Sequence, residues 1–499
     1  MNNDSQLVPK ELSWLSFNER VLQEAADTSN PIVERLRFLG IFSNNQDEFF
    51  EVRVADLRRK LVLEEQTDSG RLTRKLLKKV NRKIGELSEL FDTTFDACIA
   101  ELKRRHVYFV NDGELTPKQS NWLRKYFANH ILRHLVPILV TDPIELSQTL
   151  QSGVSYLVVQ LKQQDTFRYA ILDIPEAVDR IIQLPNEIKN MRKYFMILDD
   201  AIRHCIDQVF AGYIDYDEIN AWSMKLSRDA EYTLEDDIEM SLVEKMEAGV
   251  KQRFHSPTVR ITFDRDTPVE VREIFARKLR FSMDDESMLL GGKYRNFKDF
   301  INFPNPGKKY LENKLLPALN CKAFDKARNV FDAIDRQDIL LYYPYQKFSY
   351  FTEMLRQAAF DPAVSTIKIN IYRAAKNSRV IESLLDARRN GKRITVNIEL
   401  RARFDEEHNL KLSETLADAG IKVLFGISGL KVHSKLCLIT RTVNGEEKSY
   451  AHIGTGNFNE KTAQIYTDFS LFTCHNEICN EVDNVFNFIE FSYKRLPFN

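Results

Sequence analysis

The stretch Gly429-Leu430-Lys431-Val432-His433-Ser434-Lys435-Leu436 places a histidine two residues from a lysine on either side. Apolar or small side chains alternate with these basic ones, and the alternation predicts a β-strand because successive side chains of a strand point to opposite faces. Lys431, His433 and Lys435 then share one face. The sequence therefore predicts a strand whose basic face carries a candidate nucleophile.

The neighbours of His433 favour its neutral imidazole. Two lysines on the same face disfavour the protonated ring, and the neutral ring is the nucleophilic form near pH 7. The lysine ammonium groups would also attract a phosphoryl group and offset the charge on its oxygens. The alternative interpretation of the triplet is an ordinary strand residue between two solvated lysines.

About twenty residues further on, Ala451-His452-Ile453-Gly454-Thr455-Gly456-Asn457-Phe458-Asn459 predicts a second strand that ends in a glycine-rich turn. Backbone N–H groups and amide side chains of such a turn can bind oxygen anions. Between the two stretches, Val443-Asn444-Gly445 predicts a hairpin turn, so the two strands should lie side by side. We expect four side chains to meet at this hairpin: His433, Lys435, His452 and Asn457.

From residue 319 onward, short buried strands alternate with helices, a pattern typical of βαβ units and a largely parallel sheet. The strands are expected at Ile339–Tyr343, Thr366–Tyr372, Arg393–Leu400, Ile421–Phe425, Val432–Ile439 and Phe469–Phe472. Arg373 and Arg403 each follow one of these strands, at the carboxyl ends where α/β sheets bind ligands. The chemistry is therefore expected in this part of the chain.

Residues 1–106 read as a helical domain. Ser16 and Glu19 form a capping-box pattern, Pro31 follows an asparagine at the start of a second helix, and Leu76–Leu102 carries one apolar stripe at helical spacing. Such a stripe is typical of a core-facing helix.

Residues 107–318 read as an α+β domain without a catalytic spacing. Strands are expected at Tyr156–Leu161, Tyr169–Ile174 and Val259–Phe263. Helices are expected from Thr116-Pro117, with Gln119 completing a capping box, and over Ala201–Phe210, Asp237–Phe254 and Val269–Leu279.

Length and composition agree with this division. A chain of 499 residues corresponds to roughly three domains at about 150 residues each. The fold class is thus a multidomain α and α/β protein: an N-terminal helical domain (1–106), an α+β middle domain (107–318) and an α/β C-terminal domain (319–499).

The net charge and the cysteines argue against several kinds of partner and binding site. A net charge of -1 gives no general basic field, so we expect no nucleic-acid partner. The six cysteines form no C-x-x-C pair, which indicates reduced thiols in a cytoplasmic protein without structural zinc. No apolar run is long enough to span a bilayer, so we expect no membrane-spanning segment in this sequence.

The H-x-K triplet followed by G-T-x-N resembles the half-site of the phospholipase D superfamily, whose active-site histidine forms a phospho-enzyme. Thr440 stands where that superfamily usually has an aspartate. This difference argues against ordinary phosphodiesterase chemistry.

A more specific resemblance covers the whole chain in order. Six stretches are similar to the bacterial polyphosphate kinase family, the long-chain-synthesising type with phospholipase-D-like C-terminal domains. They are Glu11–Leu22, Phe42–Phe49, Ile369–Arg373, Arg401–Glu407 and the two histidine segments.

The resemblance implies that ATP passes its γ-phosphoryl group to His433 and then, reversibly, to the end of an inorganic polyphosphate chain, releasing ADP. His452 matches a second histidine needed for that phosphorylation, as a general acid/base or a hydrogen-bonding group. Lys435 is the lysine of the half-site, and Asn457 belongs to its anion-binding turn.

Four further positions match nucleotide or phosphate contacts of the family. Arg373 and Arg403 match positions that hold the phosphates and the associated Mg²⁺. Because an arginine cannot ligate a cation, we interpret both as clamps on oxygens of a metal-bound phosphate, with a carboxylate such as Asp405 nearby. Asn45 and Tyr466 match nucleotide contacts. Without the resemblance, Asn45 would be interpreted as a helix N-cap or loop residue, and Tyr466 as a half-buried strand aromatic.

The family carries a second phospholipase-D-like domain, whereas this sequence ends at Asn499, shortly after the first. The leading interpretation is a polyphosphate kinase that forms a homo-oligomer, as the family does. The alternatives are a catalytically impaired polyphosphate-binding or assembly module, and a phospholipase-D-type phosphodiesterase.

Overall fold

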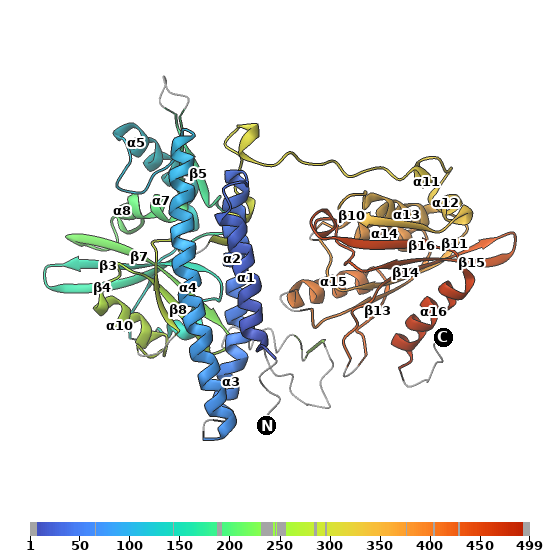
Figure 1. Ribbon diagram of the computed structural model, residues 1–499, viewed down its shortest axis with the longest axis horizontal. Coiled ribbons are helices and arrows are strands. Elements are labelled where there is room, and N and C mark those ends of the chain that lie inside the picture. The colour runs from blue at the N-terminus through green and yellow to red at the C-terminus, as the bar shows by residue number, and fades with distance from the viewer. Residues whose placement is uncertain are drawn as a thin grey trace. The chain divides into compact units, whose positions relative to one another are not determined.

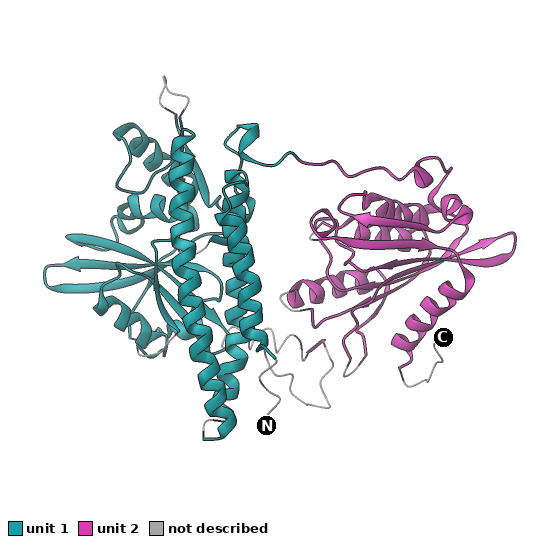
Figure 2. Ribbon diagram, in the orientation of Figure 1, with its two compact units in different colours: residues 1–233, 251–314 teal, residues 234–250, 315–499 magenta. Residues whose placement is uncertain are grey.

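The computed structural model describes most of the chain, in two compact units (Figure 2). One unit comprises residues 1–233 and 251–314, and the other comprises residues 234–250 and 315–499. The described residues are 7–64, 66–142, 144–186, 192–230, 243–244, 246, 256–283, 287–294, 297–375, 377–402, 405–427 and 430–492.

The first unit begins with helices (Figure 1). They are α1 (Lys10–Ala26), α2 (Ile32–Phe49), the π-helical segment Phe50–Val54, α3 (Ala55–Leu63) and α4 (Asp68–Arg104). Most of the predicted apolar stripe of α4 is buried, from Val80 to Leu102, whereas Leu76 and Phe95 are only partly buried. The helix α2 begins directly after Pro31, as predicted. The capping box predicted at Ser16 is wrong, because Ser16 lies inside α1 and its Oγ donates to the carbonyl of Leu12.

These helices share a core with the segment that follows them. Phe195 and Ile197 belong to the same buried cluster as Leu36 and Leu87. Gly40 explains how closely α2 approaches the helical turn Phe297–Asn302: a Cβ at Gly40 would lie 2.4 Å from the backbone nitrogen of Ile301. The helical and α+β segments of the first unit are therefore packed as one body.

Two sheets follow the helices of the first unit. The strand orders are β1-β6-β5 and β2-β4-β3-β7-β8-β9. The strands are β1 (Val107–Phe109), β2 (Ile138–Leu139), β3 (Ser155–Gln163), β4 (Thr166–Asp173), β5 (Ile181–Leu184), β6 (Lys193–Ile197), β7 (Glu218–Arg228), β8 (Thr258–Asp264) and β9 (Met288–Gly291). The helices are α5 (Pro117–Tyr126), α6 (Leu146–Thr149), α7 (Leu198–His204), α8 (Ile206–Phe210) and α10 (Val269–Lys278).

The predictions for this segment are largely confirmed. Thr116 and Gln119 form the capping box of α5, and the three expected strands correspond to β3, β4 and β8. The expected helix Asp237–Phe254 lies almost wholly outside the described residues. The strands β1, β2, β5, β6, β7 and β9 were not predicted.

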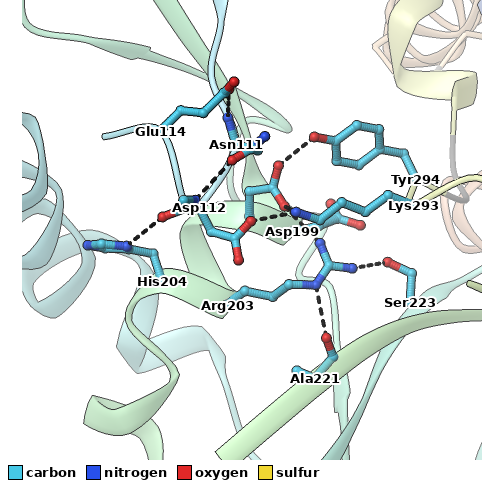
Figure 3. Close-up of polar contacts among 12 residues, drawn as sticks. Asn111, Asp112, Glu114, Asp199, Arg203, His204, Ala221, Ser223, Lys293 and Tyr294 are labelled. Carbon is cyan, nitrogen blue, oxygen red and sulfur yellow. Dashed lines mark hydrogen bonds and ion pairs between the residues drawn. The ribbon is translucent and has the colours of Figure 1, made fainter. Parts of the chain in front are cut away.

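A buried polar network joins separate parts of the first unit. Asp200 is 0% exposed and accepts hydrogen bonds or ion pairs from Arg203, Lys293 and Tyr294. Arg203 in turn donates to the carbonyl of Ala221 on β7 (Figure 3). Since the buried carboxylate is fully paired, this network ties α7, β7 and the segment after β9 together.

The second unit is built on one sheet of seven strands, with the order β10-β16-β15-β14-β11-β12-β13. The strands are β10 (Ile339–Tyr343), β11 (Val364–Ile371), β12 (Arg393–Ile398), β13 (Lys422–Leu424), β14 (Lys435–Val443), β15 (Glu446–Gly454) and β16 (Asp468–Thr473). The helices are α11 (Lys322–Asp325), α12 (Val330–Arg336), α13 (Ser349–Phe360), α14 (Arg379–Arg389), α15 (Glu406–Asp418) and α16 (Asn476–Glu490).

The prediction of a largely parallel sheet is wrong. Only the β11–β12 and β12–β13 pairs are parallel, and the other four pairs are antiparallel. The predicted hairpin is itself one reason, because a two-residue turn joins antiparallel neighbours. Asn444 and Gly445 form that turn with φ of 54° and 86°, the signs that such a turn requires.

Helices cover both faces of this sheet (Figure 1). Leu436, Leu438 and Ala451 pack with Cys479 and Phe486 of α16 on one face. α13 and α14 contact each other and the strands β11 and β12. The fold class predicted from the sequence is therefore confirmed.

The remaining sequence-based expectations concern thiols and membranes. All six cysteines are free, and Cys98, Cys205, Cys437 and Cys479 are buried. Over the described part of the chain, no helix combines the length and apolarity needed to cross a membrane.

Candidate active site

The candidate site lies where β11 and β12 end and β14 begins. The predicted start of the strand around His433 is wrong. Residues 431–434 are not part of a strand, and β14 begins at Lys435. The pairing between β14 and β15 begins with Lys435 opposite Gly454, and it extends no further because β15 ends at Gly454. His433 therefore lies on a segment at the edge of the sheet, where a substrate can reach it.

The imidazole of His433 packs against Tyr372, the residue that directly follows β11. The two ring centroids are 4.9 Å apart, and the ring planes meet at 85°. The Nζ atoms of Lys431 and Lys435 lie 5.5 and 5.3 Å from the centre of the same tyrosine ring. Tyr372 thus contacts His433 and lies close to both lysines that flank it.

Burial is the largest cause that lowers the pKa of His433, followed by the charges of Lys435, Lys431 and Arg373, while Glu399 opposes them. The predicted effect of the neighbouring positive charges on this pKa is present, although the effect of burial is larger. Both effects favour the neutral, nucleophilic ring at neutral pH.

Lys435 is 5% exposed and donates to the carbonyl oxygen of His433. Burial lowers its pKa to about 8, and the charge of Asp468 raises it. Lys435 therefore keeps its positive charge at neutral pH and can lose it in mildly alkaline solution.

The carboxylate of Glu399, which follows β12, holds the segment that carries His433. Its Oε2 accepts from the backbone N–H of Val432 at 2.7 Å, and its Oε1 accepts from the backbone N–H of Arg401 at 3.0 Å. Arg401 also donates to the carbonyl of Leu430. At 3% exposure, Glu399 is a buried connection between the end of β12 and the histidine segment.

A second buried side chain fixes the ends of β11 and β12 relative to each other. Asn409 of α15 is 0% exposed, and its Nδ2 donates to the carbonyls of Tyr372 at 3.1 Å and Glu399 at 3.0 Å. Tyr372 and Glu399 are therefore held from the same helix.

His452 lies on β15, two residues before that strand ends at Gly454, and is 1% exposed. Its Nε2 is 2.8 Å from Ser470 Oγ, and its ring packs against Phe351, Phe458 and Phe472. Burial lowers its pKa to about 3, so the ring is neutral across the neutral pH range. Among the described residues its Nδ1 has no hydrogen-bond partner.

The predicted glycine-rich turn follows β15. A Cβ at Gly454 would lie 3.2 Å from the ring of His452 and 3.6 Å from Lys435, so the two predicted residues flank this glycine. A Cβ at Gly456 would lie 2.3 Å from a carboxylate oxygen of Asp468. Asn457 follows, and its buried Oδ1 has no partner within the described part of the chain.

Arg373 and Asp405 form an ion pair with 2.7 Å between Nε and Oδ2. Burial raises the pKa of Asp405, and Arg373 opposes that shift. Arg403 lies outside the described residues. Within those residues, no group of three or more histidine, cysteine, aspartate or glutamate side chains could hold a metal ion.

The two predicted nucleotide contacts lie in different units. Tyr466 belongs to the second unit, on the turn before β16, and is 62% exposed; the alternative of a half-buried strand residue is wrong. Asn45 belongs to the first unit, inside α2, and donates to Asn18 Oδ1 at 3.1 Å. The alternative of a helix N-cap is therefore also wrong for Asn45.

Sequence reasoning missed Tyr372, Glu399 and Asn409 as site residues. Tyr372 lies within the Ile369–Arg373 motif, but its contact with His433 joins two residues that are 61 positions apart in the sequence. A glutamate or an asparagine carries no local signal for a buried backbone contact.

A neutral imidazole at an exposed sheet edge, with a buried lysine beside it and an arginine close by, is suited to accept a phosphoryl group. The fold and the site thus define a phosphoryl-transfer enzyme of the multidomain α and α/β class. Three family profiles match the chain: the polyphosphate kinase N-terminal domain at residues 7–110, the middle domain at 118–303 and the C-terminal domain 1 at 329–495. The chain belongs to the polyphosphate kinase family.

Curated relatives agree with this membership. The chain is 50% identical to the polyphosphate kinase of Escherichia coli K12 over 502 residues and 49% identical to that of Yersinia pestis over 500 residues. Each match covers 100% of this chain and 73% of the relative.

A solved structure agrees as well. The crystal structure of polyphosphate kinase from Porphyromonas gingivalis is 32% identical, with a TM-score of 0.78. The match covers 98% of this chain and 70% of that one.

Proposed function

We propose that this chain is an ATP:polyphosphate phosphotransferase that works through a phosphohistidine at His433. The observation that carries the proposal is the position of the His433 imidazole against Tyr372 and beside Lys435, where burial and the neighbouring positive charges lower its pKa. Membership of the polyphosphate kinase family supports the choice of ATP and inorganic polyphosphate as the two substrates.

The first half-reaction forms an N–P bond. A ring nitrogen of His433 attacks the γ-phosphorus of ATP, the bond from that phosphorus to the β,γ-bridging oxygen breaks, and ADP leaves with the electron pair. In the second half-reaction, a terminal oxygen of polyphosphate attacks the same phosphorus and the N–P bond breaks. The histidine is restored, the polymer is one phosphate longer, and each step is reversible.

Three cations offset the charge of the transferred group in this proposal. Lys431 and Lys435 flank the histidine, and Arg373 is a clamp on phosphate oxygens that exchanges Asp405 for substrate. Arg403 is proposed for the same duty from the resemblance alone. Mg²⁺ is proposed to arrive as part of the nucleotide substrate, held by its phosphates and not by a protein cluster.

The buried His452 is proposed as a neutral hydrogen-bonding group and not as a titrating acid. Its low pKa and its contact with Ser470 support this role. Asn457 is proposed to contribute an amide to the phosphate-binding turn. Asn45 and Tyr466 remain proposed nucleotide contacts. An amide can form hydrogen bonds with the adenine base of ATP, and an exposed aromatic ring can stack on it.

Three further properties are proposals from the family resemblance: a homo-oligomer, a cytoplasmic location, and at most a peripheral contact with the inner membrane. The division at residues 106 and 318 is likewise proposed.

A product assay tests the function. The chain is incubated with MgATP and a short polyphosphate primer, and ADP and polymer length are followed together. A kinase gives ADP and added phosphate units in equal amounts. Polyphosphate binding without ADP would indicate the binding module, and hydrolysis of a diester such as bis(p-nitrophenyl) phosphate would indicate the phosphodiesterase.

A further inference from the structure

Tyr372 occupies an unusual position among the charges of the site. It lies at the end of β11, half-buried, and its ring contacts His433 edge to face. Three cationic groups lie around the same ring: the Nζ atoms of Lys431 and Lys435, at 5.5 and 5.3 Å from its centre, and the Cζ of Arg373, at 5.8 Å.

Like charges that gather at one place repel each other, so the arrangement needs a compensating group. An aromatic face carries negative electrostatic potential and attracts a cation within about 6 Å of its centre. The two lysine distances satisfy this limit. The ring therefore allows two ammonium groups to remain close to one imidazole before any phosphate is present.

The same ring restricts the imidazole. Edge-to-face aromatic contacts fix the relative orientation of two rings, and this one is near perpendicular at 85°. The tyrosine is itself held, because Asn409 donates to its carbonyl at 3.1 Å. A rigid ring that is anchored through its backbone can thus set the orientation of a nucleophile on a separate segment.

We propose that Tyr372 is a positioning residue of the phosphoryl transfer, whose ring orients His433 and gathers Lys431 and Lys435 for the incoming phosphoryl group. The inference rests on the proposed function, and it assigns the duty to the ring and not to the hydroxyl group. No chemical step passes through Tyr372.

Two substitutions separate the ring from the hydroxyl group. Y372F keeps the ring, and Y372L removes it while keeping an apolar side chain of moderate size. The matched control is Y345L, because Tyr345 is an aromatic residue of the same unit that packs against Tyr342 and not against His433.

The measurement is the single-turnover rate of phosphohistidine formation from MgATP. We expect Y372F and Y345L to stay within about twofold of the wild type, and Y372L to fall by about tenfold or more, since misorientation of a reacting group by about 1 Å can cost about a hundredfold. A wild-type rate in Y372L, or an equal loss in Y372F and Y372L, would overturn the inference.

A pH readout separates positioning from a general loss of structure. The groups that face His433 are Lys431 and Lys435 on its own segment, Tyr372 and Arg373 after β11, and Glu399 after β12. Removing the ring exposes the imidazole and releases the lysines, and both changes raise the pKa of His433. The acid limb of the rate profile should therefore move to higher pH in Y372L and stay in place in Y372F.

Titration of ¹³C-labelled histidine by NMR gives the pKa of His433 without turnover. If the wild type forms no phosphohistidine, the proposed function fails while this titration still decides the role of the ring. An unchanged pKa of His433 in folded Y372L would contradict the inference. Should Y372L not fold, Y372M replaces it, with the same expected shift and the same contrary result.

Discussion

The carboxylate of Glu399 accepts a hydrogen bond from the backbone N–H of Val432 at 2.7 Å, across 33 positions of the sequence. Val432 directly precedes the proposed phosphohistidine, so the end of β12 determines where His433 lies. The site is thus assembled by buried polar contacts between segments that are far apart in the chain.

Replacing Glu399 by glutamine should destabilise the site. Glutamine has one acceptor oxygen, so one of the two N–H groups that Glu399 now pairs would face an NH₂ group. Leaving a buried donor unpaired costs about 1–3 kcal/mol. We expect E399Q to lower the free energy of unfolding by that amount and to slow phosphorylation of His433.

Denaturant unfolding checks this prediction, with E407Q as the matched control. Glu407 is an exposed partner of Lys411 on α15, and an exposed ion pair of this kind contributes little to stability because solvent screens it. Equal unfolding midpoints for E399Q and E407Q would contradict the account.

The rate of phosphohistidine formation should depend on pH in two limbs. The pKa of His433 is lowered, so the rate should rise with pH through a value below 6.5 as the ring loses its proton. The pKa of Lys435 is about 8, so the rate should fall again as the pH passes that value and the ammonium charge is lost. A single-turnover pH profile measures both limbs.

K435R isolates the alkaline limb. An arginine stays charged throughout the accessible pH range, so its variant should keep the acid limb and lose the fall near pH 8. An alkaline fall of unchanged position in K435R would show that another group causes it.

Because of His452, the free energy of unfolding should decrease as the pH falls. The pKa of His452 is about 3 in the folded chain and near 6.5 when unfolded, so the unfolded state binds more protons between these values. Its contribution is therefore complete above pH 6.5 and is lost as the pH falls, by about 2 kcal/mol between pH 6.5 and 5.

Unfolding of the wild type and of H452Q at pH 7 and pH 5 tests this dependence. The other histidines are common to both chains, so the wild type should lose about 2 kcal/mol more than the variant. Parallel losses in the two chains would mean that His452 is not buried in its neutral form.

Two helical glycines of the first unit should respond oppositely to alanine. A Cβ at Gly40 would meet the backbone of Ile301 at 2.4 Å, whereas a Cβ at Gly85 on α4 has no atom within 4 Å. We expect G40A to lose about 1–3 kcal/mol by overpacking and G85A to gain up to about 1 kcal/mol of stability. Thermal unfolding of the two variants compares them, and a stable G40A would refute the close approach of α2.

The sequence predicted the features that depend on local patterns. The stripe of α4, the capping box of Thr116 and Gln119, and the Asn444-Gly445 hairpin each follow from a few neighbouring residues. The same reasoning failed at Ser16, where a cap pattern lies inside a helix because packing outweighs it.

The remainder depends on long-range contacts that local patterns do not encode. The strand containing His433 begins later than predicted, because its pairing ends where β15 ends. The mixed sheet follows from pairings such as that of β11 with β14. Tyr372, Glu399 and Asn409 acquire their roles only when three strand or helix ends meet.

Labelling with [γ-³²P]ATP shows whether His433 carries the phosphoryl group. If it does, the bound label is labile to acid and stable to base, persists in S434A and is absent from H433A. Label retained in H433A would show that another residue is the acceptor.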